Sequence, residues 1–480
     1  MVRAPSFKIP NGFFSCNFPY EPLNSTLVEQ QCLSLLKHCS SMEQFSQIHA
    51  LLQTFGLHGE LHVVNELLRF CATSPSADLS YACRILHHTD GCAPSSCNIL
   101  IRAYVARHSP RGAIRVYHRM RNLGIEPNQY TFPFLFNACA ALLALEAGKQ
   151  VQADALKYSS DSDGYVLNSL INFYGHCHEV LHARKVFDEM PLRTVVSWNS
   201  IITACVMNLR IHDSVELFLK MRRCGFDPNE ITMVVLLSAC SQSCKLSLGR
   251  RAHALVILKG MTMNCHLGTA LVDMYAKCGA VTVANKVFDR MPMRNVQTWS
   301  AMVVGLAQHG FAQEALQLFL KMKRPIITPN CVTFLGVLCA CSHVGLVDDG
   351  YRYLHEMEHV YSIKPSMAHY GAMVDILCRA GRLKEAFSFI MNMPIKADAV
   401  MWRTLLGASM IGDVNDEDGV MKMVRRKLLE MEPRCCDNFV MVANLYAEVG
   451  MWEKSAKLRR LMRAEGLKKV AGESYLGMPG

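Results

Sequence analysis

Two stretches of this chain are near-copies of each other. Residues 170–202 read LINFYGHCHEVLHARKVFDEMPLRTVVSWNSII, and residues 271–303 read LVDMYAKCGAVTVANKVFDRMPMRNVQTWSAMV, so Phe187 recurs as Phe288 at an offset of 101 residues. The same offset relates Trp198 to Trp299; Pro127 to Pro228 and Pro329; and Cys139 to Cys240 and Cys341. Self-similarity at a fixed period indicates a repeat architecture in which each unit packs on its neighbours. The sequence therefore predicts an all-α fold, a right-handed α-solenoid superhelix of helix-turn-helix repeats.

The offset of 101 residues resolves into units of 35, 35 and 31 residues in rotation. In the unit 195–229 the apolar periodicity predicts two helices, at 197–207 and 212–224. Gly225 follows the second helix where a left-handed cap is needed. The buried stripe of that helix is predicted to consist of Val215, Phe218, Leu219 and Met221. The successive units are 94–128, 129–163, 164–194, 195–229, 230–264, 265–295 and 296–330, followed by the altered units 331–366 and 367–398.

The composition suits stacked helical layers. Hydrophobic residues make up 51% of the chain, which has 28 Met and 21 Cys and a net charge of +10. A chain of this length has ample core, so the cysteines are interpreted as buried thiols of a reducing compartment rather than as a disulfide scaffold. No apolar run reaches the roughly 18 to 20 residues of a membrane-spanning helix. The positive charge favours an anionic partner.

Four segments are expected along the chain. Residues 1–26 contain scattered basic residues and several Ser but no acid before Glu21, which suits an organelle transit peptide; an irregular tail fits the composition equally well. Residues 27–93 carry a degenerate form of the repeat, as terminal repeats often do. Residues 94–398 form the regular array of long, long and short units. Residues 399–480 form a C-terminal extension.

The recurring motifs resemble a known family. VFDEMP, VVSWN, GKQVQADALK and the closing EPN, in units of 35, 35 and 31 residues, look like the plant pentatricopeptide repeat family and its long-and-short mixed-repeat (PLS) subclass. The tail resembles the C-terminal E-type extension of that subclass. It carries MWRTLLGAS from Met401, LLEMEP from Leu428, FVMVANLYAEVGMWEKSAKLRRLM from Phe439 and KKVAGESYL from Lys468.

The resemblance implies a function. It implies a sequence-specific binder of single-stranded organelle RNA that acts as a site-recognition factor for C-to-U editing, without being an enzyme. Many relatives continue into a DYW-type deaminase domain, whereas this chain stops at Gly480, so a deaminase would be recruited in trans through residues 399–480. The stop also suits a shortened gene model. The implied compartment is the mitochondrion or the chloroplast, the mitochondrion being favoured, with no cofactor and no membrane partner.

Two positions of the units carry polar side chains in register. The fifth residue is polar amid apolar neighbours, and the last residue is often Asn or Asp. A short amide or hydroxyl at one helix start, beside an amide at the repeat junction, has the groups to bond the edge of a splayed base. The candidate base-reading pairs are Asn98 with Asn128, Asn168 with Thr194, Asn199 with Asn229, Thr269 with Asn295, and Ser300 with Asn330.

The recognition rule of the family assigns bases to these pairs. It implies adenine for the pairs that contain Thr269 and Ser300, and a pyrimidine for the other three. The middle units carry Pro133, Val234 and Leu335 at the fifth position and are expected to add little sequence information. A second interpretation stays open, because Ser, Thr and Asn near a helix start are common N-caps and Asn after Pro is an ordinary turn residue.

Two further residue sets have open roles. Basic residues recur in the second helices, where they would neutralise phosphates or simply form a solvated helix face. They are Lys149, Arg184, Lys185, Arg250, Arg251 and Lys286. Apolar residues of the extension either pack the terminal helices or face a partner; they are Val400, Trp402, Leu405, Leu406, Tyr446 and Trp452.

Catalytic and metal motifs are weak. A zinc deaminase needs His-x-Glu followed by Pro-Cys-x-x-Cys; His58-Gly59-Glu60 matches the first half, but no Cys-x-x-Cys follows. His176-Cys177-His178 resembles a metal cluster until it is aligned with Lys277-Cys278-Gly279 at an expected turn. Cys139 and its two copies follow a small Ala, as buried thiols do. The sequence predicts no catalytic residues, no metal and no cofactor.

Two rival functions remain. The first keeps RNA binding without editing, so that the protein stabilises or helps to process a transcript; the E-type tail argues against it. The second is a tetratricopeptide-like solenoid that binds a peptide, but its 34-residue period and its Trp-Leu-Gly-Tyr pattern are missing.

Overall fold

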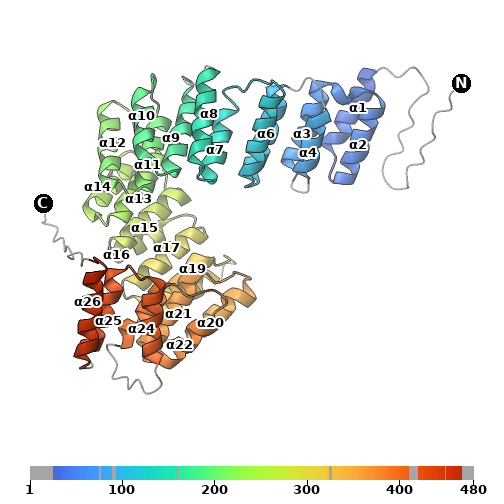
Figure 1. Ribbon diagram of the computed structural model, residues 1–480. Helices are drawn as coiled ribbons and strands as arrows, with labels where there is room; N and C mark the ends of the chain where they lie inside the picture. Colours follow the sequence, from blue (N-terminus) through green and yellow to red (C-terminus); the bar gives the residue numbers. More distant parts are fainter. Residues whose placement is uncertain are drawn as a thin grey trace. The chain divides into compact units, whose positions relative to one another are not determined.

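The computed structural model describes residues 25–74, 77–88, 93–158, 162–323, 327–409, 420–448 and 450–467. Those residues contain helices and connecting turns but no strand. The chain divides into two compact units, residues 1–226 and 227–480. In each, successive helices form hairpins that stack side by side (Figure 1), which confirms the all-α solenoid class. Residues 1–24, most of the predicted transit peptide, lie outside the described residues.

The helices of the first unit are α1 (Ser25–Lys37), α2 (Met42–Thr54), the 3₁₀ helix η1 (Leu57–Gly59), α3 (Leu61–Thr73), α4 (Leu79–His88), α5 (Pro94–Ala106), α6 (Pro110–Asn122), α7 (Phe132–Ala141), α8 (Leu145–Lys157), α9 (Gly164–His176), α10 (Val180–Glu189), α11 (Val195–Met207) and α12 (Ile211–Arg223). Odd-numbered helices from α5 onwards are the first helices of repeat units, and even-numbered ones are the second helices.

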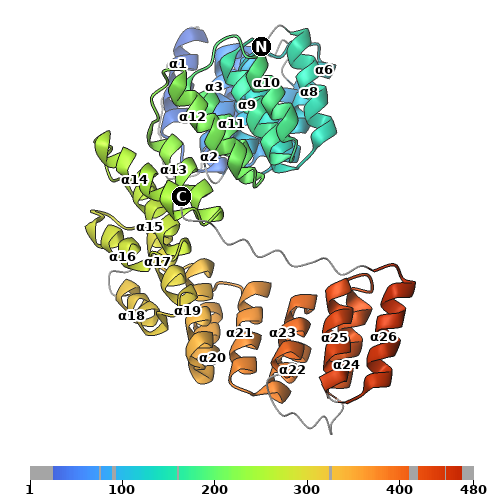
Figure 2. The same cartoon turned by 90° about the vertical axis from the view of Figure 1, so that its left-hand side faces the viewer.

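The helices of the second unit are α13 (Glu230–Gln242), α14 (Leu246–Leu258), α15 (Cys265–Lys277), α16 (Val281–Arg290), α17 (Val296–Gln308), α18 (Ala312–Lys323), α19 (Cys331–Val344), α20 (Val347–His355), the π-helix η2 (Glu356–Val360), α21 (Met367–Arg379), α22 (Leu383–Asn392), α23 (Ala399–Ser409), α24 (Val420–Met431), α25 (Cys436–Glu448) and α26 (Trp452–Ala464). Figure 2 shows the later hairpins of this unit standing in a row.

The hairpin of α11 and α12 confirms the predicted helices and corrects one detail. Gly225 has φ 83°, and the backbone N–H of Phe226 donates to the Met221 carbonyl at 3.1 Å, which is the expected left-handed helix ending. The predicted stripe was wrong at two of its four residues, because Val215 is only half-buried and Leu219 is 45% exposed. Both sets follow the i, i+3, i+4 rhythm, so spacing alone did not distinguish them. The buried residues of α12 are Ser214, Leu217, Phe218 and Met221.

The second helix of the 31-residue units is shorter because of the sequence VFDEMPLR, residues 186–193 in the first of these units. Met190 is buried and Pro191 follows it, so α10 stops after 10 residues. Arg193 then donates to the Phe187 and Asp188 carbonyls at 3.0 and 2.7 Å, which satisfies the open end of the helix. Its guanidinium lies 5.1 Å from the Phe187 ring, and that ring packs edge-on against Trp198. The copy 101 residues later consists of Phe288, Arg294 and Trp299.

The altered unit 331–366 is one residue longer than its counterparts. The second helix of this unit changes at Glu356 from α-helix to the π-helix η2, which runs to Val360. A π-turn takes up one inserted residue without ending the helix. The insertion is therefore absorbed inside the hairpin, and the next first helix, α21, keeps its place in the stack.

Three glycines set the distance between neighbouring hairpins. Gly148, Gly249 and Gly350 lie 101 residues apart, each in the first turn or two of a second helix. A Cβ built on Gly148 would lie 2.0 Å from Cζ of Phe173 on α9, and one on Gly249 would lie 2.3 Å from Sδ of Met274 on α15. These second helices approach the following first helix so closely that only glycine fits without displacement of the neighbour.

We expect the substitution Gly148→Ala to destabilise the first unit by about 1–3 kcal/mol, because a phenyl ring has few ways to move aside in a packed core. Chemical denaturation followed by circular dichroism measures the change. Gly164→Ala is the matched control, since a Cβ there meets nothing within 4 Å and Gly164 lies at the start of α9. Equal stability of the two variants would contradict the close approach.

Candidate nucleic-acid interface

The side chains of Ser300, Asn330 and Thr333 meet where one unit joins the next. Ser300 lies in the second turn of α17, Asn330 is the N-cap of α19, and Thr333 is the third residue of that helix. The Asn330 Oδ1 accepts from the backbone N–H of Thr333 at 2.9 Å, from its hydroxyl at 3.0 Å and from the Ser300 hydroxyl at 3.2 Å. Among the described residues no acceptor takes the Nδ2 group of Asn330. The amide is thus held with its oxygen inward and a donor left for a ligand.

The pair Thr269 and Asn295 is joined through a third residue. The Thr269 hydroxyl lies 2.7 Å from the Thr298 hydroxyl, which in turn donates to the Asn295 Oδ1 at 3.0 Å. The backbone N–H of Thr298 donates to the same oxygen at 3.0 Å, so Asn295 caps α17. This junction has the same arrangement of a fifth residue, a capping amide and a buried hydroxyl.

The pair Asn98 and Asn128 is in direct contact. The Nδ2 group of Asn98 donates to the Asn128 Oδ1 at 3.0 Å, and the Thr131 hydroxyl donates to the Asn98 Oδ1 at 2.8 Å. The fifth residue of this junction is therefore an amide, whereas Thr269 and Ser300 provide a shorter hydroxyl at the same position. The junction changes its hydrogen-bond pattern with the fifth residue while its frame stays the same.

One predicted pair is not brought together in this way. Thr194 caps α11 in a reciprocal capping box with Ser197, and no hydrogen bond joins it to Asn168. The Oδ1 of Asn168 is buried and has no hydrogen-bond partner among the described residues. Asn199 is 7% exposed and belongs to the first compact unit, whereas Asn229 caps α13 in the second.

The capping interpretation and the base-reading interpretation apply to the same atoms. The last residues of most units accept a hydrogen bond from the next helix, as the sequence alternative expected; they include Asp163, Thr194, Asn229, Asn264, Asn295 and Asn330. Capping uses only the side-chain oxygen of an asparagine. At Asn295 and Asn330 no acceptor among the described residues takes the NH₂ group, whereas the NH₂ group of Asn264 donates to Glu230. Capping therefore orients the amide without itself using the NH₂ group.

A third residue of several junctions was missed by the sequence analysis. It is the third residue of the following unit, whose hydroxyl forms a hydrogen bond with the closing residue before it and, at Thr131, Thr298 and Thr333, with the fifth residue of the preceding unit. The signal was present, since a polar residue three positions after an N-cap is the spacing of a capping box. These residues are fully buried; they are Thr131, Ser197, Thr232, Thr298 and Thr333.

An exposed apolar side chain at the second residue of several units was also missed. The second and fifth residues lie three apart on a helix and so share a face. Their exposed fractions are far above those of the core: Tyr130 64%, Tyr165 67%, Val196 58%, Ile231 62% and Val332 47%. The aromatic rings of Tyr130 and Tyr165 provide a surface on which the face of a base can stack, and the aliphatic groups of the other three provide apolar contact.

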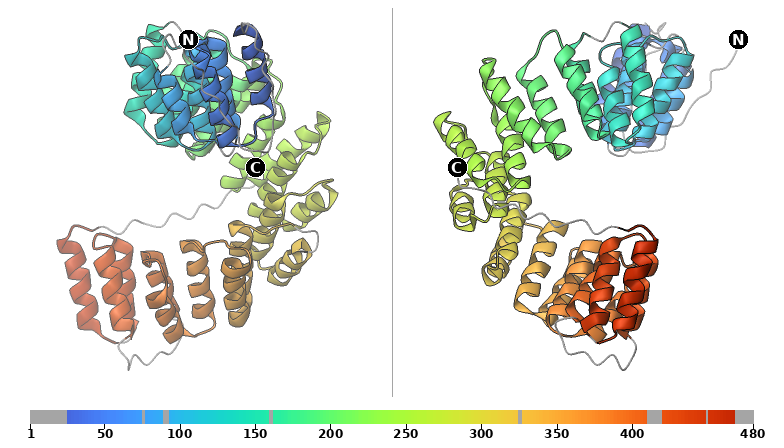
Figure 3. Two further views of the ribbon diagram at one scale, coloured as in Figure 1. Left: turned by 90° about the vertical axis from the view of Figure 1, so that its right-hand side faces the viewer. Right: turned by 60° about the vertical axis from the view of Figure 1, so that its left-hand side comes forward.

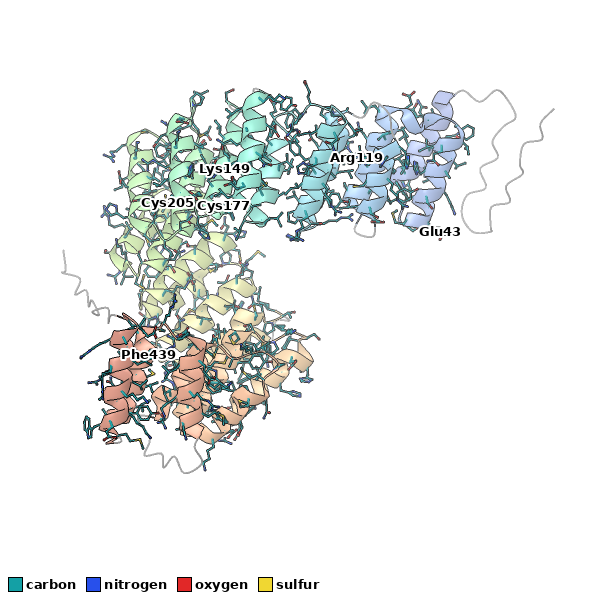
Figure 4. The ribbon with its side chains drawn as sticks, in the orientation of Figure 1. Glu43, Arg119, Lys149, Cys177, Cys205 and Phe439 are labelled. Carbon is teal, nitrogen blue, oxygen red and sulfur yellow. The ribbon has the colours of Figure 1, made fainter. Side chains whose placement is uncertain are left out.

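The six basic residues of the second helices fall into two groups. Lys149 on α8 (Figure 4) pairs with Glu146 at 2.9 Å, and this hydrogen bond raises the pKa of its ammonium. Arg184 and Lys185 likewise pair with acids one turn later. Arg250, Arg251 and Lys286 are exposed, and no ion pair forms at them within the described part of the chain. The last three remain the better candidates for phosphate contacts.

The histidines and cysteines that drew attention in the sequence have ordinary surroundings. The Nδ1 of His176 lies 2.8 Å from the Asn172 carbonyl, and that of His178 lies 2.8 Å from the Asn208 Oδ1. No group of three or more His, Cys, Asp or Glu side chains suited to a metal occurs in the described ranges. The predicted burial of Cys139, Cys240 and Cys341 is confirmed. Burial raises the pKa of these thiols to about 11, 12 and 12.

Three apolar residues of the extension pack the terminal helices as one alternative predicted, and two others are exposed. Trp402, Leu405 and Leu406 are buried in the packing of α23, whereas Val400 and Trp452 are 58% and 69% exposed. The described helices include none with the length and apolar content that crossing a bilayer requires.

Comparison with known proteins finds matches to repeat and C-terminal motif families along this chain. The E motif matches residues 419–476, the PPR repeat family matches 95–141 and 193–242, and the PPR repeat matches 165–195, 269–296, 297–324 and 368–396. A pentatricopeptide repeat-containing protein of Arabidopsis thaliana is 52% identical over 94% of this chain and 90% of its own length. A second from the same plant, named chloroplastic/mitochondrial, is 36% identical over 94% of this chain and 73% of its own length.

The fold comparison points the same way. The crystal structure of a pentatricopeptide repeat protein from maize superposes with a TM-score of 0.59 at 16% identity, over 91% of this chain and 68% of that one. The family is shown by three findings together: repeat matches along the array, an E motif at the end, and a relative aligned over nearly the whole length. The chain belongs to the pentatricopeptide repeat family, in the mixed-repeat subclass that carries a C-terminal E motif.

Proposed function

We propose that this protein binds single-stranded RNA in a sequence-specific manner and serves as a site-recognition factor for C-to-U editing of organelle transcripts. The observation that carries the proposal is the recurring junction, in which a capping amide, a fifth residue and a buried hydroxyl form one hydrogen-bonded set. At three junctions of the array a set of this kind offers an oriented donor to the edge of a base. The E motif supports editing over other RNA-related roles.

The fifth residue and the closing residue of a junction have different roles in recognition. Ser300 is only 2% exposed and its hydroxyl is used within the protein, so it acts by orienting the amide of Asn330. The NH₂ group of that amide then donates to the base. Thr269 acts on Asn295 in the same way, through Thr298. We assign adenine to these two junctions and a pyrimidine to the Asn98 and Asn128 junction, in which an amide replaces the hydroxyl at the fifth position.

Each further part of the proposal has its own support. Exposed Tyr130 and Tyr165 are placed to stack on bases, which contributes affinity without sequence preference. Residues 399–480 would recruit a deaminase supplied in trans. Residues 1–26 would direct the chain to an organelle, mitochondrion or chloroplast, in agreement with the name of one Arabidopsis relative.

The proposal is tested in a plant line that lacks the gene, by sequencing complementary DNA of both organelle transcriptomes. We expect one or a few cytidines to stay unconverted and to be edited again after complementation with the full chain. Transcript abundance and transcript ends are measured in the same samples. Full editing together with a lost or shortened transcript would instead identify a stabilisation or processing factor, and unchanged transcripts throughout would overturn RNA recognition in the organelles.

A further inference from the structure

A groove runs over the three helices that the E motif covers, α24, α25 and α26, which stand side by side at the end of the second unit (Figures 2 and 3). Its volume is about 590 Å³, within the range of roughly 300–1,000 Å³ that binding pockets commonly have. The floor is apolar and mostly aliphatic. It is formed by Leu429, Val442, Tyr446, Leu458 and Leu461.

The rim of the groove is strongly basic. Lys422 and Arg426 project from α24, and Lys454 and Lys457 project from α26. Glu430 offsets Arg426 only weakly, at 3.5 Å between exposed side chains. Within the described residues no carboxylate pairs with the three lysines. The two walls therefore carry positive charge on both sides of an apolar strip.

Two cations, one from α24 and one from α26, lie near the ring of the aromatic residue of the floor. The Lys454 ammonium lies 5.7 Å from the centre of the Tyr446 ring, and the Arg425 guanidinium lies 5.0 Å from it. Cations over a ring face are partly ordered before any ligand arrives. This favours a ligand that carries anionic groups at a fixed distance from an apolar centre.

We infer that this groove binds an acidic amphipathic helix of a protein partner. Apolar side chains at i, i+3, i+4 and i+7 of such a helix match the aliphatic floor, and carboxylates on its two flanks match the lysines of α24 and α26. A single-stranded nucleic acid would satisfy the charges but not the floor, because bases stack on aromatic surfaces and this floor has one aromatic residue. The inference rests on the proposed function only in taking the partner to be a deaminase-bearing or editing-complex protein.

The test uses the full chain and a fluorescent synthetic peptide of about 18 residues, with Leu at the helical positions above and Glu on both flanks. Fluorescence anisotropy compares it with the same peptide in which every Glu is Lys, and with a single-stranded RNA. We expect the acidic peptide to bind and the basic one not to bind. The double variant Lys422→Glu/Lys457→Glu should weaken binding of the acidic peptide by at least about tenfold, since two attractive contacts become repulsive.

Two further variants separate the floor from the total charge. Leu461 is 49% exposed, so the substitution Leu461→Ser should cost little stability. It should also weaken binding of the acidic peptide. The variant Lys220→Glu/Lys321→Glu makes the same change in net charge on exposed residues of α12 and α18 and should leave peptide binding unchanged.

Several results would overturn the inference. They are no binding of the acidic peptide, equal binding of both peptides, or an equal loss in the control variant. A loss of RNA affinity in Lys422→Glu/Lys457→Glu as large as the loss of peptide affinity would identify a nucleic-acid site instead. The outcome is separable from the proposed function, because peptide binding is measured without reference to any edited cytidine.

Discussion

The variant Thr269→Asn is expected to change the base preferred by its unit from adenine to a pyrimidine. The chain itself supplies the template, since Asn98 at the equivalent position bonds Asn128 directly and takes the hydroxyl of Thr131 as its second partner. Thr298 is available to play the same part beside Asn295. Discrimination between two bases at one contact amounts to about 1–3 kcal/mol, so the preference should reverse by tenfold or more.

Binding of a randomised single-stranded RNA pool, followed by sequencing of the bound fraction, measures this change without knowledge of the natural target. Only one position of the selected sequence should change. Thr282→Asn, the same chemical change on an exposed second-helix residue, is the control and should select the original sequence. If Thr269→Asn also selected the original sequence, the paired residues would not read the base.

The variant Phe319→Ala is expected to destabilise the second unit by about 3–5 kcal/mol, the usual cost of emptying a fully buried aromatic site. Phe319 on α18 is 0% exposed. Its ring lies 5.6 Å from the rings of both Phe334 on α19 and Tyr353 on α20, and 4.6 Å from the Lys323 ammonium. A single truncation there removes contacts between two successive hairpins.

Because repeats stabilise each other only through neighbours, the damage should be local. Hydrogen exchange followed by mass spectrometry should show faster exchange in α18, α19 and α20 than in α13 and α14. Phe311→Ala is the matched control, since Phe311 just before α18 is 41% exposed and its loss should cost less than about 1 kcal/mol. Uniform loss of protection throughout the unit would show that the stack unfolds as one body.

The repeat period predicted much of this architecture. Units of 35, 35 and 31 residues indicated hairpins, and Gly124 and Gly225 have the left-handed φ of 69° and 83° that their places after second helices require. The predicted buried stripe of α12 was wrong at Val215 and Leu219, because two sets of positions satisfied the same spacing. The π-helix at Glu356 could not be located in advance, since one extra residue in a unit can enter a loop or a helix with little difference in the sequence pattern.

The candidate site was less accessible from the sequence. Asn98 and Asn128 share a hydrogen bond although they lie 30 residues apart. That contact depends on the packing geometry between neighbouring hairpins, and the repeat period does not specify this geometry. The buried hydroxyl of Thr333 could have been found from its capping spacing. The groove of the E motif could not, because it depends on which faces of α24 and α26 remain uncovered.

Under the proposed function a closing residue both caps a helix and contributes to base reading, which restricts how the chain can change its RNA target. The residue that closes one unit must accept a hydrogen bond from the helix of the next, and only a few side chains do that well. In this chain the closing residues are Asn128, Asp163, Thr194, Asn229, Asn264, Asn295, Asn330, Ser366 and Asp398. All are Asn, Asp, Ser or Thr. Exchanges among these four residue types differ little in helix stability, so under the proposed function the preferred RNA sequence can change one unit at a time while the stability of the fold is kept.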